Sequence, residues 1–194
     1  MNPTDYYNQN AQSFFDRTIN ADLRHAYAKF LPHLTPKAHI LDAGCGSGRD
    51  SLYFMEKGFD IVAFDASIEM VKLSSHLLGL QTLHLCFQEL TFKEEFDAVW
   101  ASASLLHITY DELPAVLQKL HLSLKPEGIL YATFKYGHGC READGRIFYD
   151  MNELSILPYL QPHFVPIEIW AIPDNRSIAP SPHQAWLNIL VQKQ

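Results

Sequence analysis

The sequence predicts an α/β protein with a doubly wound, Rossmann-like and mostly parallel sheet. Three features support this. Short apolar runs alternate with segments of helical periodicity through the middle of the chain. Three alternating glycines directly follow the first apolar run. Two more apolar runs come late and are joined by a proline-rich stretch. Alternating strands and helices imply parallel strands with helices on both faces of the sheet.

The first half of the expected core is strand, helix, strand, helix. The strands are His39–Ala43 and Asp60–Phe64, and the helices are Arg49–Lys57 and Ile68–Leu78. Glycines stand where both helices should stop, and Ser67 is a suitable N-cap for the second helix.

The second half of the core contributes three more strands and one helix. The strands are Thr82–Phe87, Phe96–Ala101 and Ile129–Phe134. Thr109 and Glu112 fit a capping box, and the helix that they open has leucines at helical spacing and ends before Pro126.

The two ends of the chain differ from the core. Residues 1–35 are expected to be helical. Their aromatic residues Tyr6, Tyr7, Phe14 and Phe15 could form a mobile lid that excludes water from the site, or could fix a helix to the core. After the core, Lys135–Gly145 is expected to be a loop and Met151–Leu160 a helix. Two late strands, Phe164–Ile172 and Ala185–Gln192, would form a hairpin at the sheet edge. We therefore expect a single domain, residues 1–194, in which 1–35 is the helical lid, 36–135 the cofactor-binding core and 136–194 the substrate side.

Composition narrows the function classes. Of 194 residues, 47% are hydrophobic and 19% charged, which is typical of a globular protein. The net charge of −7 disfavours nucleic acid as a partner. The three cysteines and ten histidines form no ligand pattern, so no metal is expected. Neither a signal peptide nor an apolar run of membrane length is evident, so we expect a cytoplasmic protein without membrane contacts.

The loop Asp42–Gly48 is the strongest candidate ligand site. Glycines after a buried strand let a ligand approach the backbone, and the next helix presents free N–H groups. The dinucleotide fingerprint requires a small third residue, but that position holds Arg49. Asp42 would oppose a pyrophosphate but suits a cationic ligand such as the ammonium or sulfonium of S-adenosylmethionine.

Asp65 is a second mark of a nucleoside site. It follows the second expected strand, where a carboxylate can accept hydrogen bonds from both hydroxyls of a ribose. Capping of the helix that follows is the alternative role for Asp65.

Four segments resemble the class I S-adenosylmethionine-dependent methyltransferases: Leu41–Ser51, Val62–Ser67, Phe96–Ile108 and Leu124–Phe134. The stretch Gly44–Ser51 is similar in particular to bacterial tellurite-resistance-type methyltransferases. The resemblance implies a seven-stranded sheet with its last two strands antiparallel at one edge, and S-adenosyl-L-methionine as cofactor.

The resemblance also implies roles for individual residues. The loop would face the methionine part of the cofactor, Asp65 with Ala66 the ribose, and Met70 the adenine, although Met70 is equally consistent with plain core packing. The family often has an acidic residue where this chain has Cys86, so Gln88, Glu89 or the backbone of Phe87 would contact the adenine. The full set of implied cofactor residues is Asp42, Ala43, Gly44, Cys45, Gly46, Gly48, Asp65, Ala66, Met70, Phe87, Gln88, Glu89 and Ala101.

Candidate residues on the acceptor side follow the fourth and fifth strands. His107 could act as a base or orient the acceptor, or could pack at a helix start. Arginines beyond the fifth strand could hold an anionic acceptor, or could be solvated surface charge. The candidates are Tyr7, Arg141, Arg146, Tyr149 and Arg176.

We therefore expect methyl transfer to a small-molecule acceptor. Ala101–Ser104 stands where nucleic-acid amino methyltransferases carry an Asn/Asp-Pro-Pro-aromatic motif, which again disfavours a nucleobase acceptor. A non-catalytic cofactor-binding module is one alternative hypothesis. A nicotinamide-dependent oxidoreductase is another, and Arg49 at the third fingerprint position speaks against it.

Overall fold

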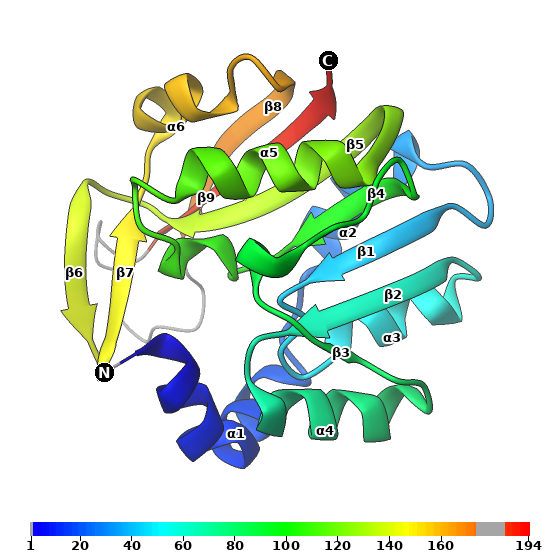
Figure 1. Ribbon diagram of the computed structural model, residues 1–194, viewed down its shortest axis with the longest axis vertical. Helices are drawn as coiled ribbons and strands as arrows, with labels where there is room; N and C mark the ends of the chain where they lie inside the picture. The colour runs from blue at the N-terminus through cyan, green and yellow to red at the C-terminus, as the bar shows by residue number, and fades with distance from the viewer. Residues whose placement is uncertain (1, 174–184) are drawn as a thin grey trace.

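A computed structural model describes residues 2–173 and 185–194. Its centre is a seven-stranded sheet in the order β3–β2–β1–β4–β5–β9–β8 (Figure 1). The first five strands are parallel, and β9 runs antiparallel to both β5 and β8. The strands are β1 (His39–Ala43), β2 (Asp60–Asp65), β3 (Leu83–His84), β4 (Phe96–Ala101), β5 (Leu124–Lys135), β8 (Phe164–Pro173) and β9 (Ala185–Lys193). The predicted fold class, including the antiparallel hairpin at the edge, is confirmed.

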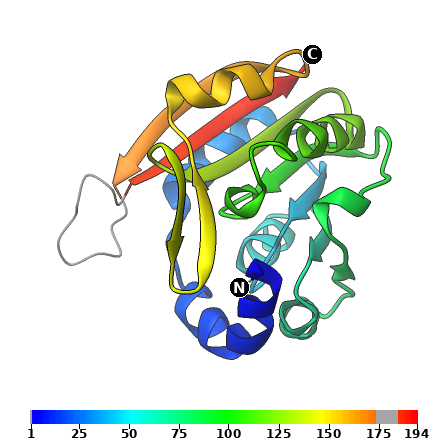
Figure 2. The same ribbon diagram turned by 60° about the vertical axis from the view of Figure 1, so that its left-hand side comes forward.

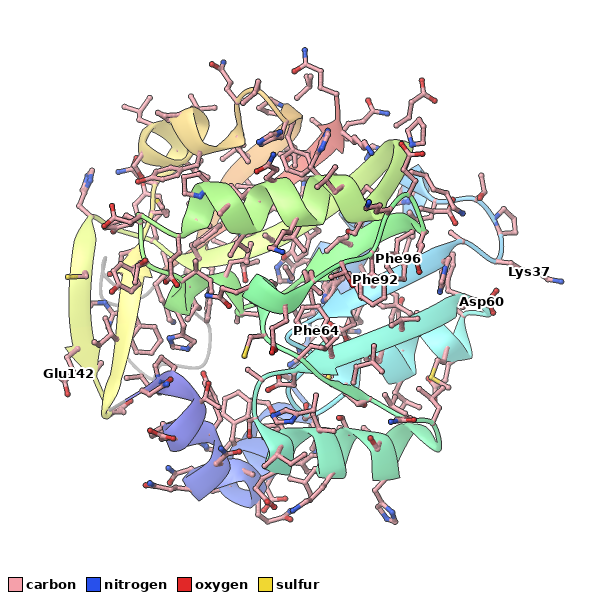
Figure 3. All side chains as sticks on the ribbon, in the orientation of Figure 1. Lys37, Asp60, Phe64, Phe92, Phe96 and Glu142 are labelled. Carbon is pink, nitrogen blue, oxygen red and sulfur yellow. The ribbon has the colours of Figure 1, made fainter. Side chains whose placement is uncertain are left out.

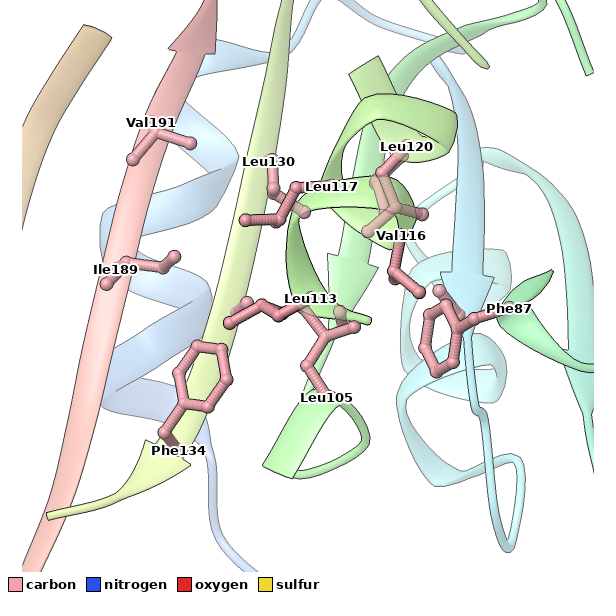
Figure 4. Packing of buried hydrophobic residues seen from close by; sticks show 14 of the residues in the cluster. Phe87, Leu105, Leu113, Val116, Leu117, Leu120, Leu130, Phe134, Ile189 and Val191 are labelled. Carbon is pink, nitrogen blue, oxygen red and sulfur yellow. The ribbon is translucent and has the colours of Figure 1, made fainter. Parts of the chain in front are cut away.

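One face of the sheet is covered by α5 (Leu113–Ser123) and α6 (Glu153–Leu160). The leucines of α5 recur at helical spacing, so one side of the helix is apolar and packs on the sheet. Figure 4 shows this side meeting apolar residues of β5 and β9. The residues of this contact include Leu113, Leu117, Leu120, Leu130, Ile189 and Val191.

The other face is covered by α2 (Arg24–Phe30), which continues into the short helix η1 (Leu31–His33), and by α3 (Arg49–Glu56). Its core is aromatic. Trp100 of β4 stacks on Tyr131 of β5 with ring centroids 4.0 Å apart, and Phe30 and Phe54 pack against Trp100. All four side chains are fully buried. They anchor the N-terminal helical segment to the sheet.

Two elements lie beyond the carboxyl ends of the parallel strands. One is α1 (Pro3–Thr18), which packs beside α4 (Ile68–Leu78). The other is a two-stranded antiparallel ribbon of β6 (Gly139–Ala143) and β7 (Arg146–Asp150) (Figures 1 and 2). In Figure 3, Glu142 marks the outer strand of this ribbon, while Lys37 and Asp60 mark the opposite end of the sheet. The ribbon and α1 therefore flank the edge where ligands bind in open parallel sheets.

The expected loop at Lys135–Gly145 is wrong, because β6 occupies residues 139–143. Asp144 and Gly145 have φ values of +52° and +74°, as in the two-residue type I′ turns that suit hairpins. The turn joins β6 to β7 in the register Ala143↔Arg146. The charged composition of β6 concealed the strand, since four of its five residues are exposed.

Several expected boundaries also shift. The third strand is shorter than predicted, only Leu83–His84, because η2 (Phe87–Glu89) follows almost at once. The helix expected from Met151 begins at Glu153, since the Asn152 side chain caps it. The Glu112 amide donates to the Thr109 hydroxyl as a capping box requires, but regular helix begins only at Leu113. Ser67 is the N-cap of α4 as predicted, accepting from the Met70 amide.

Within the described residues, no helix combines the length and the apolar character needed to cross a bilayer.

Candidate functional site

A cavity of about 2620 Å³ lies at the carboxyl ends of the parallel strands. One end is walled by the loop after β1 and by residues that follow β2 and β3. The other end is walled by η3 (Leu105–His107), by the β6–β7 ribbon and by the start of α1. Pockets for a single small ligand are commonly about 300–1,000 Å³. The cavity therefore has room for two ligands side by side.

The glycine loop is tightly packed against the next crossover. Gly44 has φ +76°, and a Cβ at this position would lie 2.5 Å from the Ser104 Cβ. Gly46 has φ +54°, and a Cβ at this position would lie 3.4 Å from the ring of Phe14 in α1. Glycine is thus required at Gly44 both for the backbone conformation and for the close approach. The loop and its neighbours form a narrow cradle at this end of the cavity.

Asp65 is fixed at the end of β2 by two backbone amides. Its Oδ2 accepts from the Gly46 amide at 2.9 Å and its Oδ1 from the Ser67 amide at 2.8 Å. Burial raises the pKa of the Asp65 carboxyl, and these hydrogen bonds act in the opposite direction. Each oxygen keeps a lone pair, and Asp65 lines the cavity. It is therefore positioned to accept from ligand hydroxyls.

Asp42 is placed differently from the other candidates. It is only 2% exposed, accepts a hydrogen bond from the Ser51 hydroxyl at 2.6 Å and does not line the cavity. Burial and the nearby Asp50 carboxyl raise its pKa. Any effect of Asp42 on a ligand in the cavity would pass through the loop rather than through direct contact.

A buried ion pair of Arg49 and Asp50 lies at the glycine-loop end of the cavity. Arg49 contacts Asp50 through two hydrogen bonds of 2.6 and 2.9 Å and donates to the Thr18 carbonyl at 3.1 Å. Asp50 also accepts from the Tyr27 hydroxyl at 2.5 Å and from the Trp100 indole at 2.8 Å. Sequence reasoning used Arg49 only to exclude a dinucleotide. The structure shows that it joins α1, α2 and α3 beside the cavity.

The expected adenine region is formed by α4 and η2. Met70 is fully buried in α4 at the cavity wall, and Phe87 packs edge-on to Phe64 with ring centroids 5.2 Å apart. Gln88 lines the cavity, whereas the Glu89 carboxylate turns back to the Cys86 amide at 2.8 Å. Of the three alternatives for the missing acidic residue, Gln88 and Phe87 thus lie at the cavity and Glu89 does not.

His107 is held at both ring nitrogens. Its Nδ1 lies 2.7 Å from the Ile147 carbonyl of β7, and its Nε2 lies 3.0 Å from the Tyr7 hydroxyl of α1. The carbonyl can only accept, so Nδ1 carries the proton and Nε2 accepts from Tyr7. Burial, with a smaller contribution from Arg146, lowers the pKa of His107 to about 4. His107 is therefore neutral near pH 7.

Helix α1 reaches both ends of the cavity through consecutive residues. Tyr7 contacts His107 and Arg146 at the ribbon end. Asn8 accepts from the Ser67 hydroxyl at 2.7 Å at the cofactor end. Helix α1 therefore contacts both ends of the cavity, and its role as a lid stays a prediction.

The cavity gathers most of the sequence candidates. The candidates that line it are Tyr7, Gly44, Cys45, Gly46, Asp65, Ala66, Met70, Phe87, Gln88, His107, Arg141, Arg146 and Tyr149. Those that do not are Asp42, Ala43, Gly48, Glu89 and Ala101. Arg176 lies outside the described residues.

The structure also adds lining residues that sequence reasoning did not single out as site residues. Phe14, Arg49 and Ser104 lie at the glycine loop. Phe14 belongs to the aromatic group named for the expected lid, whereas no sequence signal marks Ser104.

The comparisons with known proteins agree with this geometry. The methyltransferase domain pattern matches residues 40–128. A putative methyltransferase, YqeM of Bacillus subtilis, is 30% identical over 139 residues, which is 66% of this chain and 56% of YqeM. The probable S-adenosyl-L-methionine-dependent methyltransferase TehB of Haemophilus influenzae is 18% identical over 56% of this chain and 40% of its own length. The middle of the chain, residues 40–128, thus matches a methyltransferase domain, and these relatives are methyltransferases.

Solved structures show the same fold. The 1,6-didemethyltoxoflavin-N1-methyltransferase of Burkholderia thailandensis, with bound 1,6-didemethyltoxoflavin and S-adenosylhomocysteine, superposes with a TM-score of 0.81. It is 24% identical, and the match covers 98% of this chain and 87% of that one. The chain spans about half the length of the curated relatives it matches.

The residues of this site fit S-adenosylmethionine, the cofactor of the methyltransferases that the chain resembles. The cradle at Gly44 and Gly46 would be filled by side chains at those positions, and Asp65 presents acceptors where a ribose needs them. Within residues 2–173 and 185–194, no group of three or more His, Cys, Asp or Glu residues could hold a metal ion. The similarity to methyltransferases disfavours the nicotinamide hypothesis.

Proposed function

We propose that this chain transfers the methyl group of S-adenosylmethionine to a small-molecule acceptor. One observation carries the proposal: a single cavity runs from the glycine loop, past Asp65, to His107 and Arg146. The donor would occupy the glycine-loop end and the acceptor the ribbon end, so the two would meet inside one enclosure.

Specific residues would hold the donor. Gly44 and Gly46 let the methionine part approach the backbone, Asp65 accepts from the ribose hydroxyls, and Met70 with Phe87 packs on the adenine. The cofactor supplies an activated methyl group on a sulfonium. The protein's contribution is to position the acceptor and to exclude water.

The ribbon end suits a small acceptor. It is bounded by α1, η3 and β7, which are tied together by the contacts of Tyr7 and His107. Neutral His107 could orient an acceptor or take its proton after Tyr7 moves aside. The bound heterocycle of the Burkholderia protein, on the same fold, supports an acceptor of this size.

Calorimetric titration with S-adenosylhomocysteine tests the donor site. We expect saturable binding, weakened roughly 10- to 100-fold in Asp65→Ala, because a hydrogen bond to a charged group contributes about 1.5–3 kcal/mol. The matched control is Glu69→Gln, whose carboxylate pairs with Lys72 on the exposed side of α4. Native protein that does not bind S-adenosylhomocysteine would contradict the proposal.

Turnover distinguishes an enzyme from a binding module. Native protein is incubated with methyl-labelled S-adenosylmethionine and a broad panel of small acids, amines, thiols and phenols. Labelled product from any of them supports the proposal. Cofactor binding without a labelled product across the panel would favour the non-catalytic module instead.

A further inference from the structure

Arg146 occupies an unusual place at the ribbon end of the cavity. It is the first residue of β7, its side chain is 13% exposed, and it lines the cavity. Its guanidinium carbon lies 4.4, 5.0 and 5.7 Å from the ring centroids of Tyr6, Phe148 and Tyr7. A full positive charge is thus held among aromatic rings.

The polar contacts of Arg146 are longer than those of two other arginines that line the cavity, Arg49 and Arg141. Its Nη1 lies 3.3 Å from the Tyr7 hydroxyl, and its Nη2 lies 3.4 Å from Asp144, whose side chain is 78% exposed. Its Nε is buried and has no hydrogen-bond partner among the described residues.

Arg49 and Arg141 each have a short contact with a buried carboxylate. Arg49 contacts the buried Asp50 at 2.6 and 2.9 Å, and Arg141 contacts the buried Asp150 at 2.7 Å. The exposed carboxylate of Asp144 is screened by solvent and contributes little to Arg146. The guanidinium therefore retains capacity for an anion on its cavity side.

The surrounding groups do not supply that anion. His107 is neutral and Tyr7 keeps its proton, since burial raises the pKa of the phenol. Asp65, at the glycine-loop end, is engaged by two amides. The sulfonium of the donor would add a second cation to the same enclosure. Two cations in a partly buried site favour a negatively charged second ligand.

We propose that Arg146 binds a carboxylate of the acceptor, so that the acceptors of this chain are small organic acids. The planar guanidinium matches a carboxylate in shape, and Phe148, Tyr6 and Tyr7 restrict its orientation. Arg146 is then a specificity-determining residue at the end of the cavity away from the glycine loop. The inference rests on the proposed function, because it assumes that the ribbon end receives the acceptor.

The test compares acids with neutral amides of the same skeleton. Protein saturated with S-adenosylhomocysteine is titrated with benzoate and benzamide, phenylacetate and phenylacetamide, and nicotinate and nicotinamide, with binding followed by ligand-observed NMR. We expect the acids to bind at least about tenfold more tightly than the amides, since an arginine–carboxylate pair is a charge-assisted bidentate contact.

The variants assign that preference to one residue. Arg146→Gln should abolish it, and Arg146→Lys should retain part of it, because lysine keeps the charge without the fork. Lys72→Gln is the matched control, since it removes one positive charge from the exposed face of α4 and should leave the preference unchanged.

Equal binding of acids and amides by the native protein overturns the inference, and so does a preference that survives in Arg146→Gln. Calorimetry of S-adenosylhomocysteine on every variant separates the two proposals. Loss of that binding in the native protein contradicts the proposed function, whereas intact binding in Arg146→Gln shows that the variant is folded. If Arg146→Gln does not bind it, the inference is decided by the native protein and by the partial effect in Arg146→Lys.

Discussion

The two ends of the cavity are constructed on different principles. At the glycine-loop end, Asp65 and Asp50 each accept several short hydrogen bonds, and the backbone of Gly44 lies against Ser104. At the ribbon end, the hydrogen-bond distances of Arg146 are longer, and one of its partners is an exposed carboxylate. Its Nε has no hydrogen-bond partner among the described residues. Satisfied buried networks fix one geometry, whereas partly satisfied ones leave capacity for a ligand. On the proposed function, we therefore expect a preformed donor site at the glycine-loop end and an acceptor site at the ribbon end that the ligand completes.

The largest expected effect comes from filling the space at Gly44. Gly44→Ala should destabilise the fold by roughly 2–5 kcal/mol, from a left-handed backbone conformation and a steric clash together, and should abolish S-adenosylhomocysteine binding. Urea denaturation and calorimetry measure the two effects.

Gly58→Ala is the matched control for this substitution. Gly58 also has a positive φ, +86°, but a Cβ there would meet nothing within 4 Å. Gly58→Ala should lower the free energy of unfolding by only about 1–2 kcal/mol and should retain S-adenosylhomocysteine binding. Equal losses in the two variants would show that close approach at the donor end is unimportant.

A smaller effect is expected from opening the network at Asp50. Tyr27→Phe removes the 2.5 Å hydrogen bond to the buried carboxylate. We expect a loss of about 1–3 kcal/mol in urea denaturation, because a buried acceptor loses a partner. Tyr53→Phe is the control, since Tyr53 stacks on Tyr27 but its hydroxyl has no hydrogen-bond partner within residues 2–173 and 185–194. Similar values for both variants would mean that the network contributes little rigidity.

The most gradual effect is the pH dependence carried by His107. Its pKa of about 4 lies below the ordinary value of 6.5, so the unfolded chain binds more protons between these values. The free energy of unfolding should therefore rise with pH between about 4 and 6.5, by at most about 1.4 kcal/mol per pH unit from this residue. Above pH 6.5 the contribution of His107 should no longer change with pH. His107→Gln should flatten that slope relative to the native protein. Parallel slopes would show that His107 is solvated, and the ribbon end looser than described.

The glycine-loop end of the cavity could be predicted well, because the sequence signals for it are local. The glycines, Ser67 and Gly79 act through the conformation of their own backbone and their nearest neighbours, and α4 begins and ends where they indicated. Asp42 shows the limit of local reasoning. Its residue type suggested a ligand contact, but the pleat of β1 directs the side chain to Ser51 and away from the cavity.

The ribbon end of the cavity could be predicted only in part, because it depends on contacts between residues that are distant in the sequence. Tyr7 and Arg146 are 139 positions apart, and no sequence pattern in either segment predicts their contact. The ribbon itself carried one usable signal, the Asp144–Gly145 pair, which is typical of two-residue hairpin turns. Tyr7, His107 and Arg146 were each named as candidates, but their assembly around one point came from the fold.

The adjacency of Tyr7 and Asn8 has a kinetic consequence. One residue ties α1 to the ribbon, and the next ties it to the start of α4. A displacement of α1 that frees one end breaks the contact at the other, since a single helical turn carries both. We therefore expect departure of the spent donor and of the methylated product to share one opening event, so that each catalytic cycle ends with both sites exposed to solvent together.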